Sequence, residues 1–238
     1  MRASKNQFRF KQFTIAQDQC AMKVCTDSCI FGAYIEGNNA TKILDIGTGT
    51  GLLSLMLAQR CQVPITAIEI EPKAATQALK NVQNSPWAAQ ITVINQAIQK
   101  FSEIYETKFE LIISNPPFFQ QNLKSPIDSI NDARHNESLS LDELATCVSK
   151  LLAINGSFWV MLPAYEMEYF TNVLYRNFIY KQTQLIIRHG VGKPTFRVIC
   201  SFGWSEKIVL QDEFIINAEN EGYSDRFKAL LGAYYLNV

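Results

Sequence analysis

Long apolar segments are missing from this sequence, and so is an apolar N-terminus. No run approaches the roughly 18–20 consecutive apolar residues that a helix needs to cross a bilayer. The first residues, Met1–Phe8, are largely polar and lack the apolar core of a secretory signal. We therefore expect a protein that is not anchored in a membrane and that works in the cytoplasm.

Histidine is scarce, and the cysteines lack a metal-binding spacing. The chain has two histidines and six cysteines. No two cysteines form a C-x-x-C pair, and the tightest group, Cys20-x4-Cys25-x3-Cys29, has no histidine nearby. The other cysteines lie mostly in apolar or helical surroundings. We expect reduced thiols and no metal.

Net charge is also absent, since 22 basic residues balance 22 acidic ones. The charges are unevenly spread, however. Residues 1–24 hold five cations and one acid, residues 188–197 hold three cations and no acid, and residues 206–225 hold six acids and one lysine. Two interpretations stay open: a basic face that holds phosphates, or solvated charges that cluster by chance.

Among the features that are present, a glycine-rich turn follows a short apolar strand predicted over Ile43–Ile46. The glycines are Gly47, Gly49 and Gly51, and a helix is predicted over Leu52–Arg60. Glycines let the chain turn sharply and let a ligand approach the backbone closely. The spacing G-x-G-x-G differs from the G-x-G-x-x-G of dinucleotide-binding turns.

Two acidic residues flank this turn. Asp45 precedes the first glycine by two residues, where a carboxylate would repel a pyrophosphate but suits the cationic amino-acid end of S-adenosylmethionine. Glu69 ends a second apolar strand, 18 residues after Gly51, where a carboxylate would hold a ribose diol. We therefore predict S-adenosylmethionine as the cofactor. The binding residues predicted here are Asp45, Gly47, Thr48, Gly49, Gly51, Glu69 and Ile70.

The segment Asn115-Pro116-Pro117-Phe118 follows another apolar strand. Asn115 offers a side-chain carbonyl, and Pro116 a backbone carbonyl, to the two hydrogens of an exocyclic amine. The two prolines stiffen the loop, and Phe118 supplies a flat face on which a base can stack. Alone, the prolines would indicate only a rigid turn. With the cofactor motif upstream, these four residues are the predicted catalytic residues of methyl transfer to a planar amine.

Strands and helices alternate along most of the chain, which predicts an α/β fold with right-handed crossovers. We expect a Rossmann-like, mostly parallel sheet of seven strands, closed by an antiparallel edge strand, with ligands at the carboxyl ends of the strands. The predicted strands are Ile43–Ile46, Ile65–Ile70, Ile91–Asn95, Phe109–Ser114, Gly156–Leu162, Tyr180–Arg188 and Phe196–Trp204. The predicted helices are Leu52–Arg60, Pro72–Asn84, Ile98–Tyr105, Ser140–Leu152, Glu166–Arg176 and Ser224–Leu236.

The first 40 residues do not follow this alternation. The segment Phe8–Phe13 alternates aromatic and polar residues, which predicts a short strand. A helix reaching Tyr34 follows, capped by Thr26 or Asp27. We expect residues 1–40 to form an extension that covers the cofactor site and residues 41–238 to form the methyltransferase domain.

A long loop of about 25 residues separates Asn115 from the helix that begins at Ser140 with a capping box. Its place beside the predicted amine site favours a functional role. Arg134 would pair with a phosphate and His135 with a base or a backbone oxygen. A structural role stays open, with Arg134 paired to Asp128 or Asp132.

Together these motifs resemble the bacterial valine-tRNA adenine-N6 methyltransferases, which modify the adenosine 3′ of the anticodon. The resemblance spans nearly the whole chain. It implies a class I methyltransferase that acts on a tRNA anticodon stem-loop, as a monomer or weak dimer. The segments that carry it are Phe8–Phe13, Met22–Asp27, the Asp45 glycine turn, Asn115–Phe119, residues 133–144, Gly192–Arg197 and the closing Tyr223 and Tyr234–Leu236.

The resemblance also implies roles for residues outside the main motifs. Lys23, Thr26 and Asp27 would lie near the cofactor, with Asp45 and Gly47 around its methionine portion. Gln96 and Ala97 would flank its adenine. Candidate RNA contacts are Lys11, Arg134, His135, Arg188, Lys193 and Arg197.

Other acceptors and another class of protein stay open. Guanine N2 in ribosomal RNA fits the same two carbonyls, and so does a protein glutamine. Protein-directed relatives usually carry a separate helical N-terminal domain, for which 40 residues are too few. A cofactor-binding module without catalysis is the remaining alternative, against which the intact Asp45, Glu69 and Asn115 speak. An unpaired loop base costs less to extract than a duplex base, so a tRNA acceptor needs no separate strand-opening domain, and we expect none in this chain.

Overall fold

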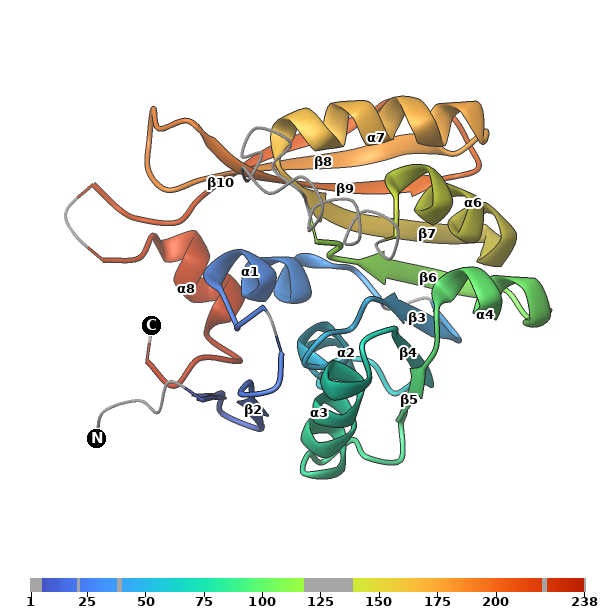
Figure 1. Ribbon diagram of the computed structural model, residues 1–238. Coiled ribbons are helices and arrows are strands. Elements are labelled where there is room, and N and C mark those ends of the chain that lie inside the picture. Colours follow the sequence, from blue (N-terminus) through green and yellow to red (C-terminus); the bar gives the residue numbers. More distant parts are fainter. Residues whose placement is uncertain (1–5, 21, 38–39, 118–138, 220–221, 238) are drawn as a thin grey trace, which may run out of the picture.

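The computed structural model describes residues 6–20, 22–37, 40–117, 139–219 and 222–237. Its centre is an eight-stranded sheet with the order β10-β8-β9-β7-β6-β3-β4-β5 (Figure 1). The strands are β3 (Ile43–Ile46), β4 (Ile65–Glu69), β5 (Ile91–Asn95), β6 (Phe109–Ser114), β7 (Leu152–Leu162), β8 (Tyr180–Arg188), β9 (Thr195–Gly203) and β10 (Leu210–Ile215). The predicted Rossmann-like α/β fold is confirmed.

Helices cover both faces of the sheet. One face packs against α1 (Thr26–Tyr34), α2 (Leu52–Ala58), α3 (Pro72–Gln83) and α8 (Asp225–Leu231). The other face packs against α4 (Ile98–Ile104), α6 (Leu141–Leu151) and α7 (Ala164–Arg176). The central strands β3, β4 and β6 are buried between the two helical layers, and none of their residues is exposed. Such continuous apolar runs are typical of parallel strands between two helical layers.

The sheet has one strand more than the sequence predicts. β10 pairs in parallel with β8 and takes the edge position. The antiparallel strand, β9, therefore lies inside the sheet between β7 and β8. The sequence of β10 gives a weak signal, because its first four residues are exposed and Phe214 is its one fully buried side chain. A polar edge strand of this kind lacks the apolar alternation that identifies a strand.

The N-terminal segment differs from the prediction in two details. The aromatic segment Phe8–Phe13 is not one strand, because β1 (Gln7–Arg9) ends in a turn that leads to β2 (Thr14–Ala16). The turn brings the rings of Phe10 and Phe13 into a stack 4.5 Å apart, and both are buried in the core. Helix α1 begins after Cys25, and neither predicted capping residue supplies its N-cap.

The helix after the long loop begins as predicted. The Ser140 hydroxyl accepts a hydrogen bond from the Glu143 backbone, and the Glu143 carboxylate accepts one from the Ser140 backbone.

In the part of the chain that the structure describes, no helix is long and apolar enough to cross a bilayer. All six cysteines are free thiols.

Candidate active site

Three neighbouring parallel strands end together at one edge of the sheet. β3 pairs with β4 through Ile46 and Ile68, and with β6 through Ile46 and Ser114. Asp45 lies near the end of β3, Glu69 ends β4, and Asn115 follows β6. The residues predicted from separate motifs are therefore brought to one edge, as the parallel arrangement requires.

The glycine turn after β3 has the conformation that only glycine adopts easily. Gly47, Gly49 and Gly51 have φ values of 72°, 57° and 82°. Amide groups of Gly47 and Thr48 donate to the carbonyl of Ile68 and fix the turn on β4. A side chain added at Gly47 or Gly49 would meet no atom within 4 Å, whereas one at Gly51 would pack against Ala78. The first two glycines thus border open space that a ligand can enter.

Asp45 is completely buried beneath this turn. Its Oδ2 atom accepts hydrogen bonds from the hydroxyls of Thr48 at 2.6 Å and Ser54 at 2.7 Å. Its Oδ1 atom is also buried, and no described residue donates to it. Burial raises the pKa of Asp45 to about 6, against the opposing effect of the two hydroxyls. A buried acceptor without a partner fits a cationic ligand group.

Glu69 joins the end of β4 to the glycine turn. Its Oε2 atom accepts from the Gly49 backbone at 2.8 Å, and its Oε1 atom accepts from the Glu71 backbone at 2.9 Å. Each carboxylate oxygen has a second lone pair for a further donor. The two backbone contacts therefore hold the carboxylate in place, and each oxygen can still accept from a ligand hydroxyl.

The residues predicted to flank a cofactor adenine lie next to Glu69. Ile70, directly after the buried strand β4, is 55% exposed and presents an apolar surface. The backbone of Gln96 donates to the Glu69 carbonyl at 3.0 Å, so that Gln96 and Ala97 are tied beside Ile70. Gln96 and Ala97 are half-buried. An apolar surface with an amide beside it suits a heterocyclic base.

Asn115 is oriented by a residue that the sequence analysis missed. Its Nδ2 atom donates to the hydroxyl of Ser28 in α1 at 3.1 Å. Its Oδ1 atom is buried and receives no hydrogen bond from a described residue. Pro116 is buried and Pro117 is exposed. The sequence carries no signal for the Ser28 contact, because the two residues are 87 positions apart.

The first turn of α1 links Asn115 to β9. Asp27 accepts from the Ser28 backbone through Oδ1 and pairs through Oδ2 with Nε of Arg197 at 3.0 Å. These two charged side chains are 7% and 18% exposed. Thr26 is half-buried at the start of the helix, and Lys23 is exposed before it. Arg197, predicted to contact RNA, is therefore engaged with α1.

The other cations of the β8–β9 hairpin lie at the same edge as Asn115. β9 is antiparallel to both β7 and β8, so β8 runs parallel to β6 and β7 and ends at the same edge of the sheet. Arg188, at this end, pairs with Glu213 at 2.5 Å and donates to the Lys193 carbonyl. Lys193 is exposed at the hairpin.

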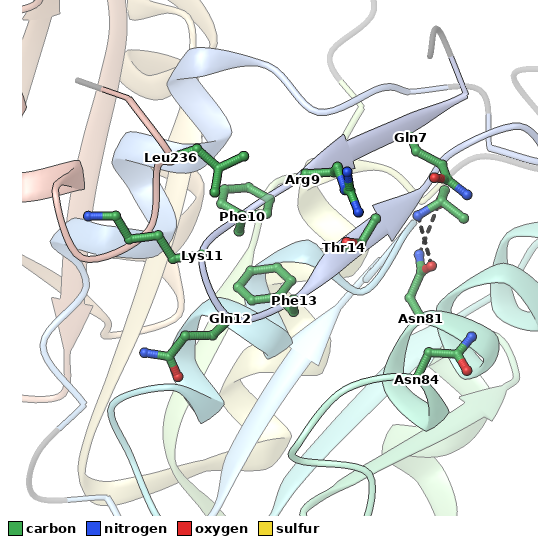
Figure 2. Close-up of a pocket in the computed structure, with 11 residues that line it drawn as sticks. Gln7, Arg9, Phe10, Lys11, Gln12, Phe13, Thr14, Asn81, Asn84 and Leu236 are labelled. Atoms are coloured by element: carbon green, nitrogen blue, oxygen red, sulfur yellow. Dashed lines mark hydrogen bonds between the residues drawn. The ribbon is translucent and has the colours of Figure 1, made fainter. Parts of the chain in front are cut away.

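Lys11 lies elsewhere, at a groove between the β1–β2 hairpin, α3 and the C-terminal segment (Figure 2). The groove has a volume of about 700 Å³, and no acidic side chain is among the described residues that line it. Lys11 is exposed and donates from Nζ to the Gly232 carbonyl at 2.5 Å. Arg9, on the same hairpin, is exposed and has no ion-pair partner among the described residues.

Three predicted site residues, Phe118, Arg134 and His135, lie outside the described residues. Among the residues that are described, no group of three or more histidine, cysteine or acidic side chains gathers in a way that would hold a metal ion.

The strand-end carboxylates, the open glycine turn and the oriented asparagine amide lie on a Rossmann-like sheet. That combination defines the protein as a methyltransferase of the Rossmann-like class. Comparison with known families agrees, since the family described as "Methyltransferase small domain" matches residues 20–136. Among solved structures, one described as a predicted O-methyltransferase from Agrobacterium tumefaciens has a TM-score of 0.66 at 14% identity, covering 89% of this chain and 99% of that chain. At such identity the likeness supports the fold alone.

Curated relatives identify the family. A tRNA1(Val) (adenine(37)-N6)-methyltransferase of Dyadobacter fermentans is 43% identical, covering 96% of this chain and 97% of its own. Its counterparts in Bacteroides fragilis and Trichodesmium erythraeum are 40% and 38% identical, each over 97% of this chain and 98% of theirs. The chain therefore belongs to the family of tRNA1(Val) (adenine(37)-N6)-methyltransferases.

Proposed function

We propose that the protein transfers a methyl group from S-adenosylmethionine to the N6 amine of an adenosine in a tRNA anticodon loop, the one 3′ of the anticodon of valine tRNA. The observation that carries the proposal is the buried Oδ1 atom of Asn115, to which no described residue donates. An acceptor held in this way costs stability unless a ligand donor fills it. An exocyclic amine is such a donor, and the family relatives are named for this acceptor.

The cofactor site of the proposal extends along three strand ends. Asp45 receives the cationic amino group, and Gly47, Thr48 and Gly49 give the ligand room beside the backbone. Glu69 accepts from the ribose hydroxyls, and Ile70, Gln96 and Ala97 flank the adenine. Helix α1 and its preceding residues, with Lys23, Thr26 and Asp27, cover the methionine end. Residues 1–40 act in this scheme as an extension of the domain formed by residues 41–238.

The bound cofactor supplies an electrophilic methyl group on a sulfonium centre. Asn115 Oδ1 and the carbonyl of Pro116 each accept one hydrogen of the amine. Since the amine lone pair is delocalised into the ring, two acceptors that favour a pyramidal nitrogen direct that lone pair at the methyl group. Phe118 stacks on the base in this proposal. As the nitrogen–methyl bond forms, the methyl–sulfur bond would break, and the nitrogen, made acidic by its positive charge, would lose one of its two protons to solvent. No strong base is therefore required.

RNA contacts are proposed on two surfaces, the β8–β9 hairpin and the groove beside the β1–β2 hairpin. The turn of the β8–β9 hairpin lies at the same edge of the sheet as Asn115, and Lys193 is exposed in this turn. The groove offers Arg9 and Lys11 to a phosphate backbone without an opposing acid among its described lining residues. A tRNA substrate implies a cytoplasmic enzyme, and a monomer or weak dimer suffices for this geometry.

The test is methyl transfer from tritiated S-adenosylmethionine to total tRNA from cells that lack the activity, followed by nucleoside analysis. Label in N6-methyladenosine is expected. A valine tRNA in which the adenosine 3′ of the anticodon is replaced should take up no label. Label in 2-methylguanosine, or in protein glutamine, would reject the adenosine assignment. Binding of the cofactor by calorimetry without transfer to any acceptor would identify a binding module instead.

A further inference from the structure

The amide of Asn115 is held by a chain of contacts that begins on β9. Arg197 pairs with Asp27, Asp27 accepts from the backbone of Ser28, and the hydroxyl of Ser28 accepts a hydrogen bond from Nδ2 of Asn115. Asp27 and Ser28 are 5% and 6% exposed. The chain of contacts is thus shielded from water along most of its length, where hydrogen bonds are stronger.

The direction of the Asn115 amide matters for the proposed chemistry. An asparagine side chain has a donor end and an acceptor end of nearly the same shape. Only the acceptor end can receive a hydrogen from a substrate amine. Since the Ser28 hydroxyl accepts the hydrogen bond from Nδ2, the Oδ1 atom is left for the substrate. The Ser28 hydroxyl also lies 3.0 Å from Cys25 Sγ, in a contact where either atom can be the donor. Sulfur is therefore available as an acceptor for the Ser28 proton while the Ser28 oxygen accepts from Asn115.

The position of Ser28 depends in turn on the ion pair behind it. The side chains of Asp27 and Ser28 occupy the first turn of α1, which has no side-chain cap. The Arg197 guanidinium reaches Asp27 from β9, and it is itself fixed by the Phe196 carbonyl at 2.8 Å and by the Phe196 ring at 4.5 Å. A planar group anchored at several points is suited to hold one carboxylate in place.

We propose that Ser28 and Arg197 are positioning residues, which set the direction of the Asn115 amide so that its oxygen faces the substrate amine. This inference rests on the proposed function for its substrate. It assigns Arg197 a role inside the protein in place of a direct contact with RNA. Neither residue touches the reacting atoms.

The first test replaces Ser28 by alanine. Ser28→Ala should lower kcat by about tenfold, because the amide loses its fixed direction, while KM for tRNA and Kd for the cofactor stay within about twofold. Ser102→Ala is the matched control, since Ser102 is 7% exposed in α4 and its hydroxyl donates, among the described residues, only within its helix and to Cys147. The control should keep the wild-type kcat. A Ser28→Ala enzyme with wild-type kcat would overturn the proposal.

A second measurement does not depend on turnover. In the wild-type protein the Asn115 side-chain amide should give a distinct pair of ¹H–¹⁵N resonances that exchange slowly with water. Ser28→Ala should shift this pair and accelerate its exchange, and Ser102→Ala should not. Unchanged resonances would overturn the proposed orientation even if tRNA proved to be the wrong acceptor. Absence of methyl transfer by the wild-type enzyme would instead reject the proposed function.

The third test separates positioning from RNA contact at Arg197. Arg197→Gln should lower kcat at saturating tRNA, while the slope of log binding constant against log salt concentration stays unchanged. A direct phosphate contact would reduce that slope by about 0.7–0.9. Since the glutamine variant leaves Asp27 without its cation, thermal melting checks that it folds. If Arg197→Gln does not fold, Arg197→Lys is used instead, since it keeps the charge and should still lower kcat. An unchanged kcat with weakened tRNA binding would overturn the proposal.

Discussion

The Glu69 carboxylate accepts a hydrogen bond from the backbone of Gly49 at 2.8 Å, and this contact joins the end of β4 to the glycine turn of β3. This one contact thereby holds the Glu69 carboxylate in place and also holds the turn over which the cofactor would lie. The free energy of cofactor binding should therefore depend on the Glu69 charge for two reasons, its own contact with the ribose and the shape of the turn.

Glu69→Gln should weaken S-adenosylmethionine binding by about 10- to 100-fold, because a hydrogen bond to a charged group contributes about 1.5–3 kcal/mol. The amide also turns a donor toward one of the two backbone N–H groups that the carboxylate accepts. Calorimetry measures the change. Glu71→Gln is the control, since Glu71 is exposed at the N-cap of α3. The affinity of this variant for S-adenosylmethionine should stay within about twofold of the wild-type value. Equal affinity in both variants would remove Glu69 from the site.

Asp45 should make cofactor binding sensitive to mild acid. Burial raises the pKa of Asp45 to about 6, so the side chain of the free protein gains a proton below that pH. If the carboxylate receives the cationic amino group, the dissociation constant should rise about tenfold between pH 7 and pH 5. Titration calorimetry across this range tests the effect. A flat profile would exclude an ionic contact at Asp45.

The same pKa predicts how stability changes with pH. The folded pKa of Asp45 lies above the unfolded value of about 4, so the folded state binds more protons between the two values. The stabilising contribution is therefore full below about pH 4 and is lost as the pH rises to about 6. Asp45→Asn should remove this loss. Denaturant unfolding at pH 4, 5, 6 and 7 compares the variant with the wild type.

Two glycines of the turn should respond differently to alanine. Gly49→Ala and Gly51→Ala both force an alanine into positive φ, at a cost of about 1–2 kcal/mol in stability. A methyl group at Gly51 meets Ala78 at an ordinary 3.6 Å, whereas one at Gly49 enters the open space proposed for the cofactor. Cofactor affinity should therefore fall with Gly49→Ala and persist with Gly51→Ala. Similar losses in both would mean that backbone strain alone disturbs the site.

Asn115→Ala should abolish turnover while cofactor affinity stays within about tenfold. The variant removes the amide oxygen proposed to accept from the amine, and it leaves the carboxylates of the cofactor site in place. Single-turnover methyl transfer and calorimetry measure the two effects. A near-wild-type rate would remove Asn115 from the mechanism.

The groove beside the β1–β2 hairpin should contribute a salt-dependent part of tRNA binding. Arg9→Gln and Lys11→Gln should each weaken binding and reduce the salt slope by about 0.7–0.9, as expected when the protein neutralises one phosphate fewer. Lys207→Gln is the control, because the β9–β10 connection lies at the opposite end of the sheet from Asn115. Filter binding between 50 and 200 mM salt tests the series. If all three variants keep the salt slope of the wild-type protein, the RNA binds elsewhere.

Much of the site follows from local patterns. Asp45, Glu69 and Asn115 each lie at or near the end of an apolar strand, and parallel strands joined by crossovers bring their carboxyl ends to one edge. The sharp turn at the glycines could be predicted, because positive φ values favour glycine at those positions. The contact of these glycines with a cofactor stays a prediction. β10 escaped prediction, because an edge strand with exposed polar residues has no apolar periodicity.

The sequence by itself determined which chemical groups stand at the strand ends, because apolar periodicity and the glycine spacing are local properties of the chain. Only the tertiary structure decided which way the Asn115 amide faces and that Arg197 is paired with Asp27. Those two facts depend on how α1, β6 and β9 pack around one another. Contacts between segments so distant in sequence arise from side-chain packing and burial, which no spacing of residues within one segment encodes.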